Sequence, residues 1–355
     1  MDVTWSATPA HVPYPQCMRS TRKPSTGSVA QSGELDLIRQ IRMRSGNVRS
    51  TAIRLGIGDD CALLRPRRGE ELAVTTDLSI AGRHFRLNWH PPQSIGHRAL
   101  ARGLSDLAAI GARPVAAFLS LGLPSELAIA RGRRPAWVQS FFDGLLALAA
   151  SHQTPLAGGD LAQSPIPVAD IVLIGAVPRG RALLRSTARP GHLLYVTGTL
   201  GGAAAALAKL AELKPRRIPK RLEAELSPHL YPQPRVVQGQ WLVRHSAASA
   251  AIDISDGLST DLTHLCEESK VAAEVDAALL PIHPAATQAQ ALSGGEDYEI
   301  LFTAPANARI PSKIAGVPIT KIGRIVPPRR NRATITLLTD HGKQSLNPEG
   351  WQHFS

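Results

Sequence analysis

Apolar residues recur along this chain with two periods, one typical of helices and one typical of strands. Leu100, Leu104, Leu107 and Ala108 illustrate the helical period, because they fall on one side of a helix that Gly111 and Pro114 would end. This spacing predicts helices over residues 34–44, 94–110, 136–151, 201–213 and 258–268. Short apolar and β-branched runs predict strands over residues 72–76, 115–123, 171–177, 192–197, 250–254 and 298–303.

The order of these elements indicates the fold class. Strands and helices alternate along the chain, which is typical of an α/β or α+β architecture. Residues 1–32 show no periodicity and read as a disordered extension, with Met18 as an alternative start. We expect two domains, 33–179 and 180–355, and a loop region rich in Pro and Arg over 215–234.

Composition narrows the class of protein further. The 355 residues are 43% hydrophobic and 19% charged, which excludes a largely disordered chain and a coiled coil. No apolar run approaches the roughly 18 residues that a membrane helix needs. Three scattered cysteines, Cys17, Cys61 and Cys266, suit a reducing compartment. We therefore expect a soluble, cytoplasmic protein that does not bind membranes.

The net charge of +12 favours an anionic partner. The basic residues cluster at 131–134, 214–221 and 329–332, each cluster beside prolines in expected loops. Aromatic residues do not interleave with them, and no zinc-finger or RNA-binding motif occurs. We do not expect specific nucleic-acid binding, although an arginine-rich nucleic-acid binder stays the alternative from a different class.

The acidic residues carry the most information. In this basic chain, aspartates follow apolar segments, often beside glycine, in five places: Gly58-Asp59-Asp60, Thr75-Thr76-Asp77, Ser105-Asp106, Gly158-Gly159-Asp160 and Asp253-Ile254-Ser255-Asp256-Gly257. A single such aspartate is usually a turn or cap residue. Five of them suggest a ligand site at the carboxyl ends of strands.

Carboxylates that gather without matching His or Cys select hard cations such as Mg²⁺, which shares its ligands with phosphates. Asp253 and Asp256 lie where a strand runs into a helix, so the backbone N–H groups near Ser255 and Gly257 are candidates to meet a phosphate. The usual nucleotide motifs are missing, because no P-loop, protein-kinase or complete dinucleotide-binding motif occurs.

Read as whole strings, these clusters resemble the thiamine-monophosphate kinases. The thiamine-monophosphate kinases belong to an ATP-binding superfamily that includes aminoimidazole ribonucleotide synthetase and selenophosphate synthetase. The strings are LGIGDDCALL (55–64), TTDLSIAGRHF (75–85), LSDLAAIGARP (104–114), GGD (158–160), AIDISDGLSTDL (251–262) and SGGEDYE (293–299). The resemblance runs from about residue 33 to residue 354.

The resemblance implies a fold and a reaction. The amino-terminal α/β domain would add its strands to a β-barrel shared by a homodimer, and the carboxy-terminal α/β domain would cover the nucleotide. The enzyme would transfer the γ-phosphoryl group of ATP to thiamine monophosphate with Mg²⁺, in the last step of thiamine diphosphate biosynthesis.

The resemblance also implies roles for particular residues. Asp60, Asp160 and Asp256 would be catalytic. Contacts to ATP would come from Gly159, Asp160, Arg185 and Ser255, and contacts to the thiamine phosphate from His84, Glu296 and Trp351. The metal ligands would be Asp60, Thr75, Thr76, Asp77, Asp106, Asp160, Asp253 and Asp256.

Two alternatives stay open at this point. The chain could be another ATP-dependent member of the superfamily, similar to aminoimidazole ribonucleotide synthetase, or a nucleotide-binding protein without catalytic activity. The intact aspartates speak against the second alternative.

Overall fold

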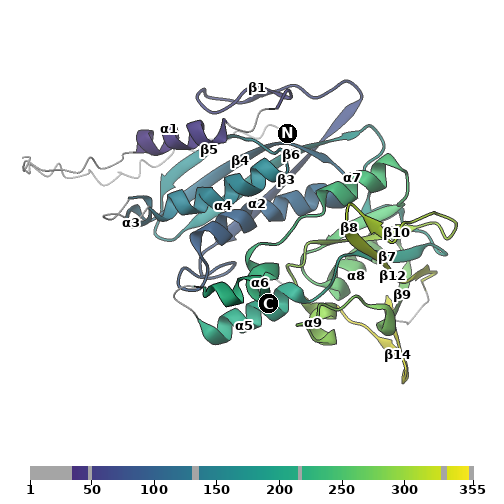
Figure 1. The fold of residues 1–355 in the computed structure, drawn as a ribbon. Helices are drawn as coiled ribbons and strands as arrows, with labels where there is room; N and C mark the ends of the chain where they lie inside the picture. Colours follow the sequence, from purple (N-terminus) through teal and green to yellow (C-terminus); the bar gives the residue numbers. More distant parts are fainter. Residues whose placement is uncertain (1–33, 47–49, 130–135, 215–217, 329–333, 352–355) are drawn as a thin grey trace, which may run out of the picture.

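The computed structural model describes residues 34–46, 50–129, 136–214, 218–328 and 334–351. The expected extension over 1–32 lies outside these residues. The described part of the chain forms two main β-sheets, each built from one half of the sequence and packed with helices (Figure 1). This confirms the mixed α/β class, while the domain boundary between 179 and 180 stays a prediction.

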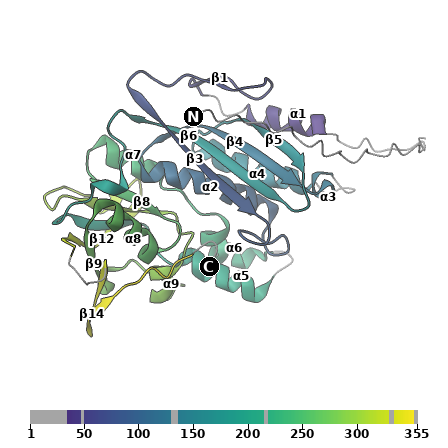
Figure 2. The ribbon, with the colours of Figure 1, turned by 180° about the vertical axis from the view of Figure 1, so that it is seen from behind.

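The first sheet has four strands in the order β3-β6-β4-β5. Their bounds are β3 (Glu70–Ile80), β4 (Arg113–Leu123), β5 (Leu156–Gln163) and β6 (Val168–Pro178). β6 pairs antiparallel with both β3 and β4, whereas β4 and β5 run parallel. Helices α2 (Pro92–Ala109) and α4 (Trp137–Ser151) cover one face, and Figure 2 shows the four strands in front of these helices.

The second sheet has eight strands and is built from residues 193–345. Along its main path the order is β14-β13-β9-β12-β7-β10-β8, with β11 paired to β12. The bounds are β7 (Leu193–Thr197), β8 (Ala250–Ile254), β9 (Ala272–Asp276), β10 (Glu299–Ala304), β11 (Lys313–Ile314), β12 (Val317–Val326), β13 (Ile335–Thr339) and β14 (Gly342–Ser345).

The remaining elements connect and cover these sheets. They are α1 (Glu34–Ser45), β1 (Ile53–Leu55), β2 (Leu63–Leu64), α3 (Ser125–Ala128), η1 (Arg185–Thr187), α5 (Gly202–Leu213), α6 (Lys220–Leu230), α7 (Val236–Arg244), α8 (Leu258–Ser269), η2 (Ala277–Leu279) and α9 (Gln288–Ser293). None of the described helices has both the length and the apolar character that crossing a membrane requires.

Helix α2 is the element on which both halves meet. It contacts β3 and β6 of the first sheet, β8 and β10 of the second sheet, and helices α4, α6 and α7. Leu100, Leu104 and Leu107 are almost completely buried in the core that α2 shares with α4. Because α2 is enclosed from several sides, any polar side chain on it must find a partner inside the protein.

The opposite face of the first sheet is uncovered along β3. Side chains alternate between the two faces of a strand, so Leu72, Val74, Thr76 and Leu78 share one face. Leu72, Val74 and Leu78 are 46%, 63% and 46% exposed. Thr75 and Asp77 point to the other face, toward α2.

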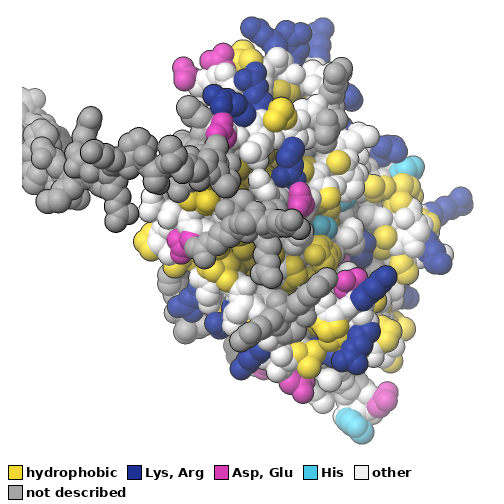
Figure 3. All heavy atoms as spheres, turned by 60° about the vertical axis from the view of Figure 1, so that its left-hand side comes forward, with side chains coloured by type: hydrophobic (Ala, Val, Ile, Leu, Met, Phe, Trp, Pro, Cys, Tyr) yellow, Lys and Arg dark blue, Asp and Glu magenta, His cyan; other side chains and the backbone are white. Residues whose placement is uncertain are grey.

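The Lys and Arg side chains of the described residues do not form one tract on the face drawn in Figure 3. They lie there in separate groups, with acidic and apolar side chains between them. The positive charge that the described residues add to this face is therefore spread out.

Most of the expected helices and strands are confirmed within a few residues, but three expectations are wrong. Residues 215–234 were expected to be a loop, yet α6 occupies 220–230, with Pro219 as its N-cap and Pro228 inside its last turn. Pro228 has no N–H to donate, so the helix forms despite the loss of one internal hydrogen bond. Asp77 and Asp160 were expected at strand ends, but β3 continues to Ile80 and β5 continues to Gln163. Only Asp253 lies close to the end of its strand, β8.

The close approach of α2 and α4 depends on glycine. A Cβ built on Gly144 would lie 1.8 Å from the carbonyl oxygen of Gln93, and one built on Gly96 would lie 1.9 Å from that of Phe141. Backbone atoms cannot move aside as the end of a side chain can. A side chain at either glycine would therefore force the two helix axes apart.

We expect Gly144→Ala to destabilise the protein by on the order of 3 kcal/mol, because the added methyl group overlaps backbone. Gly103→Ala on α2 is the matched comparison, since its Cβ would meet the terminal Cδ1 of Leu173 at 2.6 Å, and the end of a side chain shifts at a lower cost than backbone. Urea unfolding of both variants measures the difference. Equal losses would contradict the role of the α2–α4 approach.

Candidate active site

A line of polar side chains on α2 organises a buried site between the two halves. Arg98, Arg102, Ser105 and Asp106 follow a spacing of four, three and one residues, which places them along one side of the helix. Ser105 Oγ donates a hydrogen bond of 2.7 Å to Asp253 Oδ2 at the end of β8. Asp106 accepts a hydrogen bond from Thr75 Oγ1 on β3. One helix thus joins strands of both sheets.

Asp77 completes this group from the middle of β3. Its Oδ1 lies 3.2 Å from Arg102 Nη2, so a buried ion pair connects β3 to α2. Arg185, in η1, lines a cavity of about 370 Å³ together with Thr75, Asp106 and Asp253. The site therefore combines three carboxylates, two hydroxyl groups and two guanidinium groups from elements that are distant in the sequence.

Burial makes these carboxylates unusually hard to ionise. It raises the pKa of Asp77 to about 6, with Asp106 adding to the shift against the attraction of Arg102. It raises the pKa of Asp106 to about 6, helped by Asp253. Burial also raises the pKa of Asp253 to about 7, with repulsion from Asp261 as the next cause. The protein has gathered negative charge where a cation would relieve the repulsion.

The donor set fits Mg²⁺. Asp77, Asp106, Asp253 and Thr75 offer hard oxygen atoms, and Arg102 and Ser105 keep the carboxylates of Asp77 and Asp253 oriented. Among the described residues, no three His, Cys, Asp or Glu side chains are arranged to hold a metal ion by themselves. A bound Mg²⁺ would therefore take further oxygens from a ligand and from water.

A second group of expected site residues lies at the other edge of the first sheet. Asp60, Gly159 and Asp160 line a separate cavity of about 630 Å³, with Ile41 of α1 and Phe142 of α4 on its wall. They belong to the β5 side of a sheet in which β6 and β4 separate β5 from β3. At about 4.8 Å between neighbouring strands, the two edges are about 14 Å apart. One chain alone does not bring both groups onto one ion.

The structure separates the two expected threonine ligands. Thr75 faces α2 and Asp106. The side chain of Thr76 points to the uncovered face with Val74 and Leu78, as strand alternation requires. The backbone of Thr76, unlike its side chain, lies near Asp77.

The turn after β8 is held by Asp261, a residue that the sequence did not single out. Asp261 Oδ2 accepts hydrogen bonds of 3.0 Å from the N–H groups of Ser255, Asp256 and Gly257. The expectation that these N–H groups meet a phosphate is therefore wrong in this conformation, because a carboxylate of the protein already occupies them. Trp351 lies beside this turn, and its backbone N–H donates a hydrogen bond of 3.1 Å to the carbonyl oxygen of Asp256.

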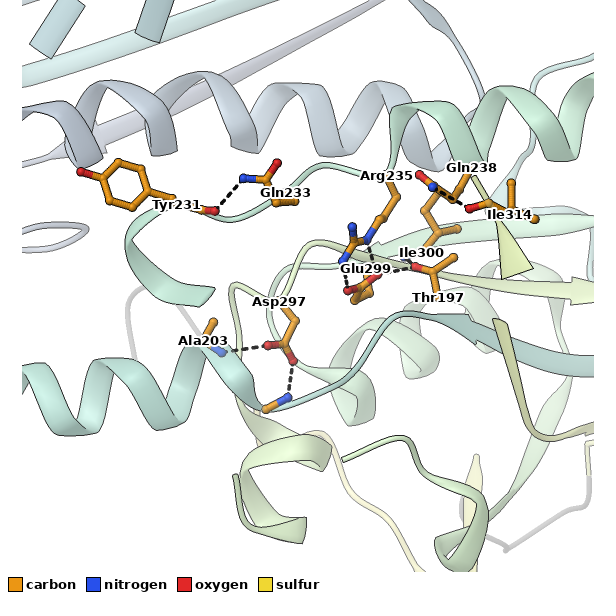
Figure 4. A network of polar contacts seen from close by, with 11 residues as sticks. Thr197, Ala203, Tyr231, Gln233, Arg235, Gln238, Asp297, Glu299, Ile300 and Ile314 are labelled. Carbon is orange, nitrogen blue, oxygen red and sulfur yellow. Dashed lines mark hydrogen bonds and ion pairs between the residues drawn. The ribbon is translucent and has the colours of Figure 1, made fainter. Parts of the chain in front are cut away.

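The three acids of the SGGEDYE string each hold a different element, as Figure 4 shows for two of them. Asp297 accepts hydrogen bonds from the N–H groups of Gly201 and Ala203 at the start of α5, at 2.6 and 3.1 Å. Glu299 accepts from Arg235 Nε at 2.6 Å and from Thr197 Oγ1 at 2.5 Å.

Glu296, the third acid of this string, pairs with Arg98 of α2 and lies 3.0 Å from His229 of α6. His84, the other side chain expected at the substrate, accepts a hydrogen bond from Ile80 N at its Nδ1. A neutral His84 ring therefore carries its proton on Nε2.

Sequence reasoning missed Arg98, Arg102, Ser105 and Asp261 as residues that arrange the site. Their common signal is a polar residue at helical spacing inside an otherwise apolar stretch, as at 98, 102, 105 and 106 in α2. An arginine in a helix normally points to solvent, so the sequence pattern alone did not distinguish Arg98 and Arg102 from surface residues.

Comparison with known proteins assigns this fold to a class. The family model "AIR synthase related protein, N-terminal domain" matches residues 58–177, and "AIR synthase related protein, C-terminal domain" matches residues 189–336. Together these matches cover most of the chain. The first spans nearly all of the four-stranded sheet, and the second spans the eight-stranded sheet from β7 to the start of β13.

Sequence relatives and solved structures narrow the class. The thiamine-monophosphate kinase of Escherichia coli (strain K12) is 39% identical over 337 residues, which are 91% of this chain and 98% of that protein. A crystal structure of thiamine-monophosphate kinase from Stenotrophomonas maltophilia K279a has a TM-score of 0.71 at 39% identity, covering 82% of this chain and 94% of that one. AaThiL complexed with AMPPCP and TMP has a TM-score of 0.70 at 29% identity, covering 91% and 97%. The chain belongs to the thiamine-monophosphate kinase family.

We expect Asp253→Asn to stabilise the metal-free protein at pH 8. Because the folded pKa of Asp253 is raised to about 7, its carboxyl group lowers stability as the pH rises from about 4 through 7. Asparagine keeps an acceptor for Ser105 and removes the charge. Melting curves with a chelator, from pH 5 to pH 8, should show a smaller loss of stability for the variant.

Added Mg²⁺ should stabilise the wild-type protein at pH 8 and affect Asp253→Asn less, because the variant lacks a charged ligand. The exposed Asp340→Asn serves as the control and should follow the wild type in both series. If Asp253→Asn melts below the wild type at pH 8 without metal, charge crowding does not describe this site.

Proposed function

We propose that this enzyme transfers the γ-phosphoryl group of ATP to thiamine monophosphate, giving thiamine diphosphate and ADP. The observation that carries the proposal is the buried group of Asp77, Asp106 and Asp253 beside Arg185, at the junction of the two halves. Crowded carboxylates suit a metal-bound polyphosphate, and the related AaThiL structure is a complex with AMPPCP and TMP. A cytoplasmic location is part of the proposal.

The chain's own groups divide the work. Arg185 adds a fixed positive charge in the same cavity as Asp106 and Asp253 and would bind ATP phosphate. The further contacts to ATP would come from Gly159, Asp160 and the side chain of Ser255, whose backbone N–H is taken by Asp261. Glu296, His84 and Trp351 would hold the thiamine phosphate. The acceptor oxygen is already anionic near pH 7, so positioning matters more than a general base.

We assign Mg²⁺ to Asp77, Asp106 and Asp253, with Thr75 beside them and Asp256 on the turn that follows β8. When bound, Mg²⁺ would neutralise the charge of two phosphate groups that must approach each other. Arg102 and Ser105 keep two of the carboxylates in place for it.

Asp60 and Asp160 enter the proposal through a second subunit. The uncovered face of the first sheet exposes Leu72, Val74 and Leu78, an apolar surface that a second copy would bury. In a barrel closed from two such sheets about a twofold axis along the barrel, β5 of one subunit lies beside β3 of the other. Asp60 and Asp160 of one subunit, in their proposed catalytic roles, and the backbone of Thr76 of the other subunit would then contribute to one shared site.

The function is tested by ADP release with purified enzyme, ATP and Mg²⁺. We expect turnover with thiamine monophosphate and no turnover with thiamine, because thiamine offers a neutral hydroxyl group that would need a base. The aminoimidazole precursor, the substrate of the alternative superfamily activity, should also be inactive. Equal turnover of thiamine, or turnover of the aminoimidazole precursor alone, would refute the proposal.

The dimer is tested with Leu72→Asp, which places a charge on the uncovered face of β3. We expect light scattering to give about twice 37.9 kDa for the wild type and a monomer for the variant, with loss of most of the activity. Leu279→Asp is the matched control, since Leu279 is a similarly exposed leucine, 42%, in η2. A wild-type monomer that is fully active would overturn the shared site.

A further inference from the structure

Arg98 joins two groups that come from different halves of the chain. Its Nη1 donates a hydrogen bond of 3.1 Å to the carbonyl oxygen of His84, in the segment that follows β3. Its Nη2 donates to Glu296 Oε1, in the segment that precedes β10. The Arg98 side chain is only 6% exposed, so this guanidinium group serves the interior.

The other oxygen of Glu296 lies beside a pair of histidines. His229 Nδ1 lies 3.0 Å from Glu296 Oε2, and His229 Nε2 lies 2.9 Å from His90 Nε2. His90 Nδ1 in turn accepts a hydrogen bond from Arg86 N at 3.1 Å. The chain of contacts thus returns to the segment that contains His84.

Electrostatics keeps this network in one charge state at neutral pH. Burial lowers the pKa of both histidines, that of His90 to about 3, so both rings are neutral. Burial alone would raise the pKa of Glu296, but Arg98 and then His229 hold it below its usual range. The only full charges in the network are therefore those of Arg98 and Glu296.

Glu296 is fixed but still accessible. Its N–H donates to Ser255 O at 2.8 Å, and its backbone has a φ of +68°, a left-handed conformation that needs support from its surroundings in a residue with a side chain. A quarter of its side chain remains exposed, whereas Arg98 and His229 are buried. Glu296 thus presents one side to a ligand while its partners hold the other.

We propose that Arg98 is a positioning residue that holds His84 and Glu296 in a fixed relation and so determines binding of the acceptor substrate. This inference rests on the proposed function, which places His84 and Glu296 at the thiamine phosphate. Among the described residues, the hydrogen bonds of the Arg98 side chain go to His84 and Glu296, and none goes to the carboxylates of the metal site. Its removal should therefore spare the ATP side of the site.

The primary variant is Arg98→Met, which keeps the length of the side chain and removes its charge and its donors. We expect the KM for thiamine monophosphate to rise about 10-fold or more, with kcat and the KM for ATP within about 3-fold of the wild type. Arg98→Lys should give an intermediate KM, because an ammonium group lacks the fork that reaches two acceptors.

Arg113→Met is the matched control. Arg113 Nη2 lies 3.0 Å from Glu70 Oε1, so this variant also removes a guanidinium group from a glutamate, within the first sheet and away from His84 and Glu296. It should leave both KM values unchanged. A general loss of structure would affect Arg98→Met and Arg113→Met alike.

A double variant tests whether Arg98 acts through Glu296. Once Glu296→Gln has removed the charge, the further effect of Arg98→Met on the KM for thiamine monophosphate should fall to about 3-fold or less. Independent, multiplying effects of the two substitutions would overturn the proposed route.

Amide hydrogen exchange tests whether Arg98 positions His84 and Glu296, and it does not depend on enzyme activity. In Arg98→Met the amides of Ile80 and Glu296 should exchange faster, because the first donates to His84 Nδ1 and the second to Ser255 O. Arg113→Met should change neither. Unchanged exchange, or equal changes in the KM values for ATP and thiamine monophosphate, would overturn the role of Arg98.

The two proposals fail in different ways. A wild-type enzyme that does not act on thiamine monophosphate refutes the proposed function. The exchange experiment still decides whether Arg98 positions the two segments.

Discussion

The structure depends on the burial of α2 between its two sheets. A helix enclosed in this way cannot leave a polar or charged side chain without a partner, so Arg98, Arg102, Ser105 and Asp106 must each be matched by groups on other elements. These matches fix β3, β8 and the segment before β10 relative to one another. The requirement that buried polar groups be satisfied thus builds the site and joins the halves at the same time.

This arrangement places three carboxylates close enough together to repel one another. Three carboxylates share a poorly solvated space, and their raised pKa values measure how unfavourable the ionised forms are there. Arg102 and Arg185 offset only part of the negative charge. A protein selected for stability alone would have replaced some of these acids by apolar residues, whereas a protein that must attract a cation gains from leaving them incompletely compensated.

The sequence predicted the regular elements well where periodicity decided them. Helices α2, α4 and α8 and strands β4 and β8 follow from apolar spacing, and the resemblance pointed to Asp77, Asp106 and Asp253, which the structure brings together. Strand β5 was missed because Gly158 and Gly159 are poor strand formers, and their conformation is imposed by pairing with β4.

Other features were beyond one-dimensional reasoning. Helix α6 was missed because the prolines around it outweighed the apolar spacing of Leu222, Leu226 and Leu230. The roles of Arg98 and Asp261 depend on partners nearly 200 residues away or on the shape of a turn, and neither appears as a pattern in the sequence. The separation of Asp60 and Asp160 from the other acids follows from strand order, which no local motif specifies.

The short run from Glu296 to Glu299 has a consequence for how such a protein can change over evolutionary time. Its three acids reach three different elements, α2, the start of α5 and the start of α7, and each fits its partner only at its present place in the chain. Inserting or deleting one residue within this run would change the spacing between the carboxylates, so that at least one of them would no longer reach its partner. Surface loops can vary in length at little cost, but this segment tolerates substitution at best and no change of spacing.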